Sequence, residues 1–455
     1  MSTNAQISND KEKLCARLSE LVDAGMPVEA FDAFEDGVRI SLQPKGDIAD
    51  VENAVLDGSL KLGRVLLVNA VTNLDDKARS ILLGGESWHR VSEAPKRIVT
   101  KLGTVVYRRS CYRRRDKQRQ HCPVDERLGL FAGCMTRPAA KHAVYQMTGQ
   151  TTQEATDTLA SFGAMQPSSS MLRRVMQDVH ERWRLREVGL HATLAAGEET
   201  PREAVSFLVS LEGAMLQMRK GEPNVSESDW REASCGALTF HDKDSNLLGA
   251  IYFGRMPEWN KFTLKRLLTQ EIERVREQQP DLVMVGASDG AVDNWTWLDR
   301  MGADHLVIDC WHATQHLWEV AEHLLRKEKW FERQRSVLLE DPQGVEKIIR
   351  ALRFQRMQAK NAKNAEAHEV IEKALGHFRQ NRRHMQYHSL RQAKLPIGSG
   401  LNEAAKDLLI NRRMKRPRMH WSMAGGQAVM TFRALLKSGR FDTAWDLLTE
   451  QQRRK

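Results

Sequence analysis

Apolar runs that end in a carboxylate constrain the fold of this chain more than any other feature. Residues 282–288 lead to Asp289, and a second run leads to Asp309 twenty positions later. Short apolar runs bounded by turn residues are typical of strands buried on both faces of a sheet. A third run, residues 206–211, ends in Glu212. We therefore predict an open sheet that presents acidic side chains at one edge.

The residues around these runs predict the α/β class. Two further strand-like runs, residues 235–240 and 248–253, flank a polar loop that predicts a hairpin, and residues 264–278 have helical spacing. The order of three strands, a helix, a strand, a helix and a strand is typical of a mixed sheet flanked by helices. Residues 187–204 have the composition of a linker that precedes this sheet.

A long charged segment follows the strands and predicts an all-helical insertion. It separates His312 from Glu403, which opens a helix behind the glycine-containing residues 398–400. The expected parts of the chain are a helical N-terminal region at 1–85, a basic β region at 86–135, a helix-turn-helix-like region at 136–186, the first part of the core at 200–315, the helical insertion at 316–395, the last part of the core at 396–440 and a tail at 441–455.

Composition favours a polyanionic partner. The chain has 455 residues, of which 69 are lysine or arginine and 59 are aspartate or glutamate, so its net charge is +10. Cationic surfaces bind nucleic acids because neutralised phosphates release condensed counterions. The alternative is a basic protein with no nucleic-acid partner. No apolar stretch reaches the ~18–20 residues of a membrane span. Six scattered cysteines fit a reducing cytoplasm, so we expect a cytoplasmic protein without a membrane partner.

The segment 96–119 is the most basic part of the chain. It holds ten lysine or arginine residues and one acidic residue, and residues 104–107 within it read as a strand. One guanidinium group can donate two parallel hydrogen bonds to the oxygens of a phosphate. The alternative is a solvated loop without a partner. The candidate DNA-binding residues here are Arg108, Arg109, Arg113, Arg114 and Arg115.

Two helices are expected after the basic segment. Thr151 and Glu154 have the spacing of a capping box for a helix that ends at Phe162, and a second helix covers residues 171–183. A helix pair across a short turn is typical of a helix-turn-helix, although many such pairs bind nothing. Arg173 and Arg174 on the second helix are further candidates for DNA contact.

Cysteines near the basic segment do not have zinc-binding spacing. Cys111, Cys122 and Cys134 lie near His121, but the short paired spacing that zinc sites use is incomplete. We expect free thiols and no zinc.

The acidic residues suit phosphodiester chemistry. Two Mg²⁺ ions about 3.5–4 Å apart stabilise the attacking and departing oxygens of an in-line displacement, and hard cations prefer carboxylates. Glu212, Asp289 and Glu403 meet that need from three separate elements, although a single acid at a strand end is more often a turn residue. Asp309 and His312 share a strand end, where His312 either orients a carboxylate or phosphate or simply packs.

Basic residues follow Glu403. A cationic helix that extends from the acidic site suits phosphate contacts, which carry no sequence information. Trp421 beyond it either stacks on a base or belongs to the core. The candidate DNA-binding residues here are Arg412, Arg413, Lys415 and Arg416.

Taken together, these motifs resemble a known family. The chain is similar to bacterial insertion-sequence transposases of the Mutator-like clade of DDE enzymes, in particular the Kra-type insertion-sequence group. The resemblance covers about 95–440. It rests on Gly103–Arg109, Cys122–Glu126 with Leu128–Leu130, Leu211–Gly213, Trp230–Glu232, Ala287–Ala291 with Trp295, Asp309–Ala313, Pro396–Gly400 with Glu403, and Arg413–Trp421.

The resemblance implies an RNase H-like core interrupted by a helical insertion. It further implies an enzyme that cleaves double-stranded DNA at terminal repeats and joins the ends to target DNA with Mg²⁺ or Mn²⁺. It makes Glu212, Asp289 and Glu403 the metal ligands, and it assigns Asp309 and His312 to the family's aspartate-to-histidine signature. A homo-oligomer assembled on nucleoid DNA is the expected working form.

One position departs from the family pattern. The first metal ligand is normally aspartate, and Glu212 replaces it. The extra methylene moves the carboxylate by about an ångström, and a displacement of that size costs ~10²-fold in rate. The alternative function is therefore a catalytically impaired, transposon-derived DNA-binding protein. A structure-specific nuclease of the same fold is a third reading, disfavoured by the helical insertion.

Overall fold

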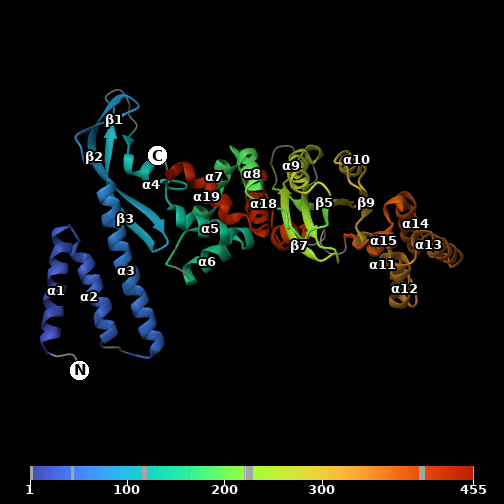
Figure 1. Ribbon diagram of the computed structural model, residues 1–455, viewed down its shortest axis with the longest axis horizontal. Coiled ribbons are helices and arrows are strands. Elements are labelled where there is room, and N and C mark those ends of the chain that lie inside the picture. The colour runs from blue at the N-terminus through green and yellow to red at the C-terminus, as the bar shows by residue number, and fades with distance from the viewer. Residues whose placement is uncertain are drawn as a thin grey trace. The chain divides into compact units, whose positions relative to one another are not determined.

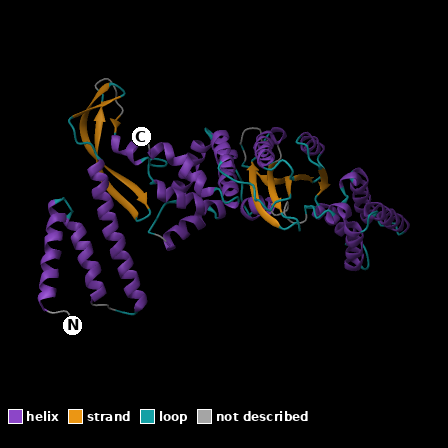
Figure 2. Ribbon diagram, viewed as in Figure 1, coloured by secondary structure: helices purple, strands orange, loops and turns teal. Residues whose placement is uncertain are grey.

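The computed structural model describes residues 4–42, 46–114, 120–162, 164–219, 221, 229–398 and 405–453. The chain divides into two compact units, residues 1–179 with 449–455 and residues 180–448. The boundary falls inside residues 136–186, which the sequence predicted to be a single helix-turn-helix-like region. Each unit contains one sheet (Figure 2).

The first unit begins with helices and continues into an antiparallel sheet (Figure 1). The helical region expected at 1–85 ends earlier than predicted, because the first strand already covers Ser80–Leu83. Asp47 caps the third helix by accepting hydrogen bonds from the amides of Ala49 and Asp50. The predicted strand at 104–107 is confirmed within β3. The helices are α1 (Asn4–Asp23), α2 (Val28–Leu42) and α3 (Ile48–Leu74), and the strands, in sheet order, are β1 (Ser80–Leu83), β2 (Glu86–Thr100), β3 (Gly103–Arg113) and β4 (Gln120–His121).

Four helices follow this sheet, including the predicted pair. The capping box is confirmed: the Thr151 amide donates to Glu154 Oε2 at 2.8 Å, and the Glu154 amide donates to Thr151 Oγ1 at 3.2 Å. The helices are α4 (Pro123–Leu128), α5 (Arg137–Gly149), α6 (Thr152–Phe162) and α7 (Ser169–Arg184).

The second unit is a mixed α/β domain with the predicted order of elements. Its sheet has the strand order β7-β6-β5-β8-β9, in which β5, β6 and β7 are antiparallel neighbours and β8 and β9 run parallel to β5. The elements are β5 (Ser206–Gln217), β6 (Trp230–His241), β7 (Leu247–Arg255), α9 (Phe262–Gln278), β8 (Val283–Ser288), α10 (Val292–Arg300) and β9 (His305–Ile308).

The expected linker at 187–204 is wrong in its first half, which forms α8 (Glu187–Ala196). Its composition looked flexible, but Leu190 and Leu194 recur at helical spacing and are buried. Tertiary packing of that apolar face outweighs the glycine at position 189.

Helices cover both faces of the sheet. Strand residues such as Leu208 and Leu211 share a core with α9 and with the helical insertion, and Ala214 and Leu216 share another with the C-terminal segment. The predicted insertion is confirmed as a helical bundle (Figure 1). Its helices are α11 (Cys310–Ala321), α12 (Lys327–Glu340), α13 (Gly344–Asn361), α14 (Ala365–Gln380) and α15 (Tyr387–Gln392), with a short turn η2 (Arg382–His384).

The C-terminal segment returns to the sheet. Helix α18 packs against β7, and its N-cap Ser422 accepts a hydrogen bond from the Gly425 amide. None of the helices in the described part of the chain has the length and hydropathy of a membrane-spanning segment. The remaining elements are η1 (Trp259–Lys261), η3 (Asp407–Asn411), α17 (Arg412–Met414), α18 (Met423–Lys437) and α19 (Phe441–Arg453).

Candidate active site

Three of the predicted acidic residues lie at one edge of the sheet. Leu211 of β5 pairs with Ser288 of β8, and Ser288 pairs with Ile308 of β9, in parallel register. The next residues are Glu212, Asp289 and Asp309, so they leave adjacent strands at the same level. Neighbouring strands are about 4.8 Å apart, so the Cα atoms of these three residues lie close together.

The sequence predicted Glu212 at the end of a strand, and this prediction is wrong. Strand β5 continues to Gln217 because β6 pairs with it along the whole length, from Glu212 opposite Cys235 to Gln217 opposite Trp230. Strand β8, by contrast, ends at Ser288. Glu212 therefore has strand residues paired with β6 both before and after it, whereas Asp289 lies in a turn.

The Glu212 carboxylate is buried between the side chains of His312 and Lys406. Its side chain is 2% exposed, and His312 Nε2 lies 3.2 Å from Oε2 and 3.3 Å from Oε1. Lys406 Nζ lies 3.6 Å from Oε2 and also 5.4 Å from the centre of the Trp311 ring. The sequence predicted that His312 orients the Asp309 carboxylate or a phosphate. In the structure His312 pairs with Glu212, and Asp309 caps α11.

The pKa of His312 is raised. Burial by itself lowers the pKa, but the hydrogen bond and the negative charge of Glu212, helped by Asp309, outweigh burial and the opposing charge of Lys406. A protonated imidazole beside a buried carboxylate adds to the compensation of its charge that Lys406 provides.

We expect the Glu212–His312 pair to stabilise the fold more at low pH than at high pH. The folded-state pKa is above the ordinary value of 6.5. Its stabilisation is therefore fully present below that value and is lost as pH rises through the folded pKa. The difference in the free energy of unfolding between wild type and His312→Gln, measured by urea unfolding across pH, should shrink as pH rises. His305→Gln, which removes an exposed histidine from β9, is the control. A difference that does not vary with pH would contradict the ion pair.

Asp309 caps the helix that carries His312. It is 1% exposed, and its Oδ1 accepts a hydrogen bond from the Trp311 amide at 2.7 Å. The cap sets the start of α11 and thereby the direction in which His312 leaves it. Asp309 thus acts on Glu212 through the helix, as a positioning residue.

Asp289 is the exposed member of the acidic edge. Its Oδ1 accepts hydrogen bonds from Ser288 Oγ at 3.1 Å and from the Ala291 amide at 3.2 Å. Gly290 follows with φ +111°, a conformation that L side chains rarely adopt. The turn therefore holds the carboxylate at the surface, accessible to solvent.

The third predicted ligand, Glu403, lies outside the described residues. In the described part of the chain, no group of three or more His, Cys, Asp or Glu side chains is placed to hold a metal ion. The carboxylates of Glu212 and Asp289 are of the donor type that Mg²⁺ prefers, so the chemistry of these two residues fits a divalent cation. In the structure, His312 and Lys406 occupy contact positions around the Glu212 carboxylate.

Two more histidines adjoin this edge and were missed from the sequence. His316 of α11 and His377 of α14 have ring centres 4.2 Å apart. Burial lowers the pKa of both, that of His377 to about 4, although the charge of Asp289 opposes the shift at His377. Both are neutral at physiological pH. The signal was the four-residue spacing of His312 and His316, which puts them on one face of a helix.

The candidate arginines of the first unit differ in their surroundings. Arg109 pairs with Asp125, and Arg114 pairs with Glu86. Arg108 is exposed and lies 3.5 Å from Glu93. Arg113, Arg173 and Arg174 are exposed, and Arg115 lies outside the described residues. The exposed arginines are the stronger candidates for phosphate contacts.

The basic residues that follow Glu403 also divide into two groups. Arg413 is 3% exposed and lies 5.2 Å from the centre of the Trp421 ring, whose Nε1 donates to the Met414 carbonyl at 2.9 Å. We therefore leave Arg413 out of the proposed DNA surface. Arg412 is exposed but pairs with Asp407, Lys415 is exposed, and Arg416 is half-buried.

The cysteines near the basic segment are free thiols. The Sγ atoms of Cys111 and Cys122 lie 3.2 Å apart on facing positions of β3 and the residue after β4. Burial and the contact with Cys111 raise the pKa of Cys122 to about 11.

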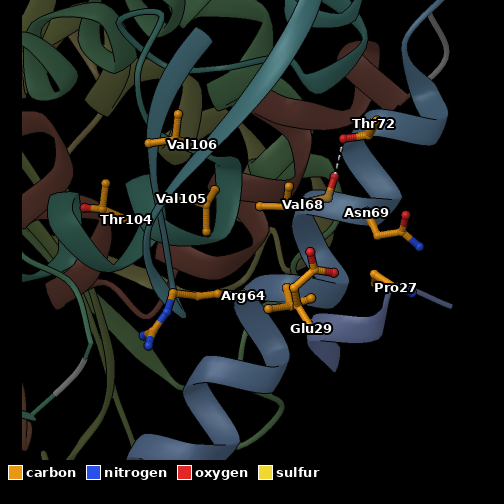
Figure 3. Close-up of a pocket in the computed structure, with 10 residues that line it drawn as sticks. Pro27, Glu29, Arg64, Val68, Asn69, Thr72, Thr104, Val105 and Val106 are labelled. Carbon is orange, nitrogen blue, oxygen red and sulfur yellow. Dashed lines mark hydrogen bonds between the residues drawn. The ribbon is translucent and has the colours of Figure 1, made fainter. Parts of the chain in front are cut away.

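A cleft of about 470 Å³ lies between α2, α3 and β3 in the first unit (Figure 3). Arg64 lines it and donates from Nη1 to the Leu102 carbonyl at 3.1 Å. Thr72 lines it too, but its hydroxyl bonds to the Val68 carbonyl of its own helix. None of the predicted site residues lines this cleft, so it is not part of the acidic site.

Neither a protein-family model nor a curated protein matches this chain.

Proposed function

We propose that this protein is a DDE-type DNA transposase with an RNase H-like core, which cleaves element ends and joins them to target DNA. The observation that carries the proposal is the parallel register of Leu211 with Ser288, which brings Glu212 on β5 level with Asp289, the residue that follows β8. The mixed sheet, the helical insertion between His312 and position 403, and the net charge of +10 support it.

The proposed chemistry assigns one role to each described residue. Glu212 and Asp289 would hold Mg²⁺ or Mn²⁺ together with Glu403. The bound metal supplies an activated attacking oxygen and a stabilised leaving oxygen. His312 and Lys406 contact the Glu212 carboxylate and orient it in its buried position. Asp309 keeps His312 in place through the cap of α11.

The proposed partner is double-stranded DNA, bound by exposed arginines of both units and by a homo-oligomer of the chain in a nucleoid-associated, cytoplasmic setting. Each phosphate contact contributes about −0.9 to the slope of log affinity against log salt concentration. We expect Arg113→Gln combined with Arg173→Gln and Arg174→Gln to flatten that slope by about 2–3. Arg39→Gln, an exposed arginine paired with Glu35 on α2, should leave the slope unchanged. An equal slope in the triple variant would place the DNA elsewhere.

The experiment that tests the proposed function is a cleavage assay on DNA that carries the flanks of the gene. We expect strand cleavage with Mg²⁺ or Mn²⁺ and none with a chelator. Binding without cleavage under either metal would contradict the enzymatic proposal.

That second outcome would instead support a catalytically impaired, transposon-derived DNA-binding protein. One observation favours this alternative: the buried side chain at position 212 already has contacts with His312 and Lys406. A carboxylate with two such partners has less need of a metal. Activity gained in Glu212→Asp, from a wild type that binds DNA without cutting it, would establish the alternative.

A further inference from the structure

The most exposed aromatic side chain of the second unit stands on a conformationally unusual turn. Trp259 is 83% exposed, and Phe262, at the start of α9, is 61% exposed. Between them, Asn260 and Lys261 have φ of +51° and +52°. Consecutive left-handed residues other than glycine are uncommon and cost energy unless their surroundings hold them. Exposure of a tryptophan on such a turn therefore needs an explanation beyond packing.

The turn lies at the acidic edge of the sheet. Strand β7 runs parallel to β5, and its last residue, Arg255, is level with Gly213, because both pair with Ser234 of β6. Gly213 directly follows Glu212. Trp259 follows Arg255 by four residues, so the turn starts from the edge that presents Glu212 and Asp289.

Ion pairs link this turn and the first part of α9 to β6 and α10, the neighbours of the two strands of the candidate active site. Lys261 Nζ lies 3.7 Å from Glu232, whose side chain covers Gly213; a Cβ at Gly213 would lie 1.7 Å from Glu232 Oε1. Lys265 Nζ lies 3.0 Å from Asp293, in the first turn of α10 behind Asp289.

Glu258 holds the base of the turn. Its carboxylate accepts hydrogen bonds from the Thr263 and Leu264 amides at 3.2 and 2.9 Å. Glu258 thus fixes the backbone where the turn enters α9, and the side chains of Trp259 and Phe262 are left to the solvent. Arg266 is exposed beside Phe262, with its guanidinium carbon 6.0 Å from the ring centre.

We propose that Trp259 stacks on an unpaired base of the DNA strand that enters the candidate active site, with Arg266 contacting the adjacent phosphate. Exposed aromatic rings next to cations bind bases by stacking in any sequence, because every base has a π face. A rigid turn suits this role, since little side-chain freedom is lost on binding. The inference rests on the proposed function, because it needs DNA at the acidic edge.

The test compares two DNA duplexes that differ in one base. One is fully paired, and the other contains a single 2-aminopurine that has no partner base. We expect Trp259→Ala to bind the second duplex roughly 5- to 100-fold more weakly than wild type does, and to lose the quenching of 2-aminopurine fluorescence that stacking on indole causes. Binding of the paired duplex should be unchanged. Trp259→Phe should retain part of both effects, and Phe354→Ala, which removes an exposed aromatic ring from α13, should retain them fully.

Each other result has a distinct meaning. If Trp259→Ala binds both duplexes as wild type does, the stacking role is wrong and the proposed function stands. If Trp259→Ala weakens binding of both duplexes equally, Trp259 does not read an unpaired base. If wild type binds neither duplex, the proposed function itself fails.

Discussion

Asp289→Asn is expected to reduce metal-dependent DNA cleavage by about 100-fold or more while DNA binding stays nearly unchanged. Losing even a residue that only supports a metal ligand typically costs 10–100-fold in activity, and an amide is a weaker ligand for Mg²⁺ than a carboxylate. Asp289 is exposed in a turn and accepts only local hydrogen bonds among those described. The substitution therefore removes charge without disturbing the core.

A matched control exists on the same segment. Asp281 is exposed two residues before β8 begins, whereas Asp289 directly follows its end. Asp281→Asn makes the same change of charge at the opposite edge of the sheet and should leave cleavage and binding intact. Equal loss of cleavage and binding in Asp289→Asn would contradict a metal-ligand role, and full activity would remove Asp289 from the site.

Arg440→Met is expected to lower the free energy of unfolding by about 3 kcal/mol, the largest stability effect we predict. Arg440 donates from Nη1 to Glu271 Oε1 at 2.6 Å, and both side chains are 2% exposed. It also donates to Glu198 at 2.8 Å from Nε. Breaking a buried pair typically costs 3–5 kcal/mol because one charge stays buried without its partner. Arg274, 3.0 Å from Glu271, remains and places the estimate at the lower end of that range.

Urea unfolding followed by circular dichroism measures this effect. Lys394→Met is the control, since it breaks an exposed pair with Asp244 in the same unit and should cost less than about 1 kcal/mol. Arg440→Lys should fall between the two, because lysine keeps the charge but loses the planar fork of donors. A loss in Arg440→Met no larger than in Lys394→Met would show that the buried network does not stabilise the fold.

Much of the second unit was predictable from the sequence for a local reason. Apolar runs of strand length, the hairpin loop at 242–246 and the helical spacing of 264–278 are patterns read within a few residues, and each matches an element. The acidic ends at Asp289 and Asp309 follow in the same way, because β8 and β9 end where their apolar runs end.

Other features were not predictable because they depend on residues far apart in the chain. Strand β5 passes beyond Glu212 only because β6 pairs with it for twelve positions. In residues 187–196, glycine and alanine obscured the helical spacing of the apolar residues. This segment forms a helix because its apolar face is buried. In both cases a tertiary contact outweighs the local pattern.

The sequence by itself determined which residue types reach the sheet edge, since strand period and turn chemistry are local properties of the chain. Only the tertiary structure decided what surrounds them. His312 meets Glu212 across 100 positions and Arg440 meets Glu271 across 169. Lys261 of the Trp259 turn pairs with Glu232, whose side chain lies over Gly213 at the same edge. The physical reason is that the partner of a buried charge is selected by proximity in the folded core, which no local spacing encodes.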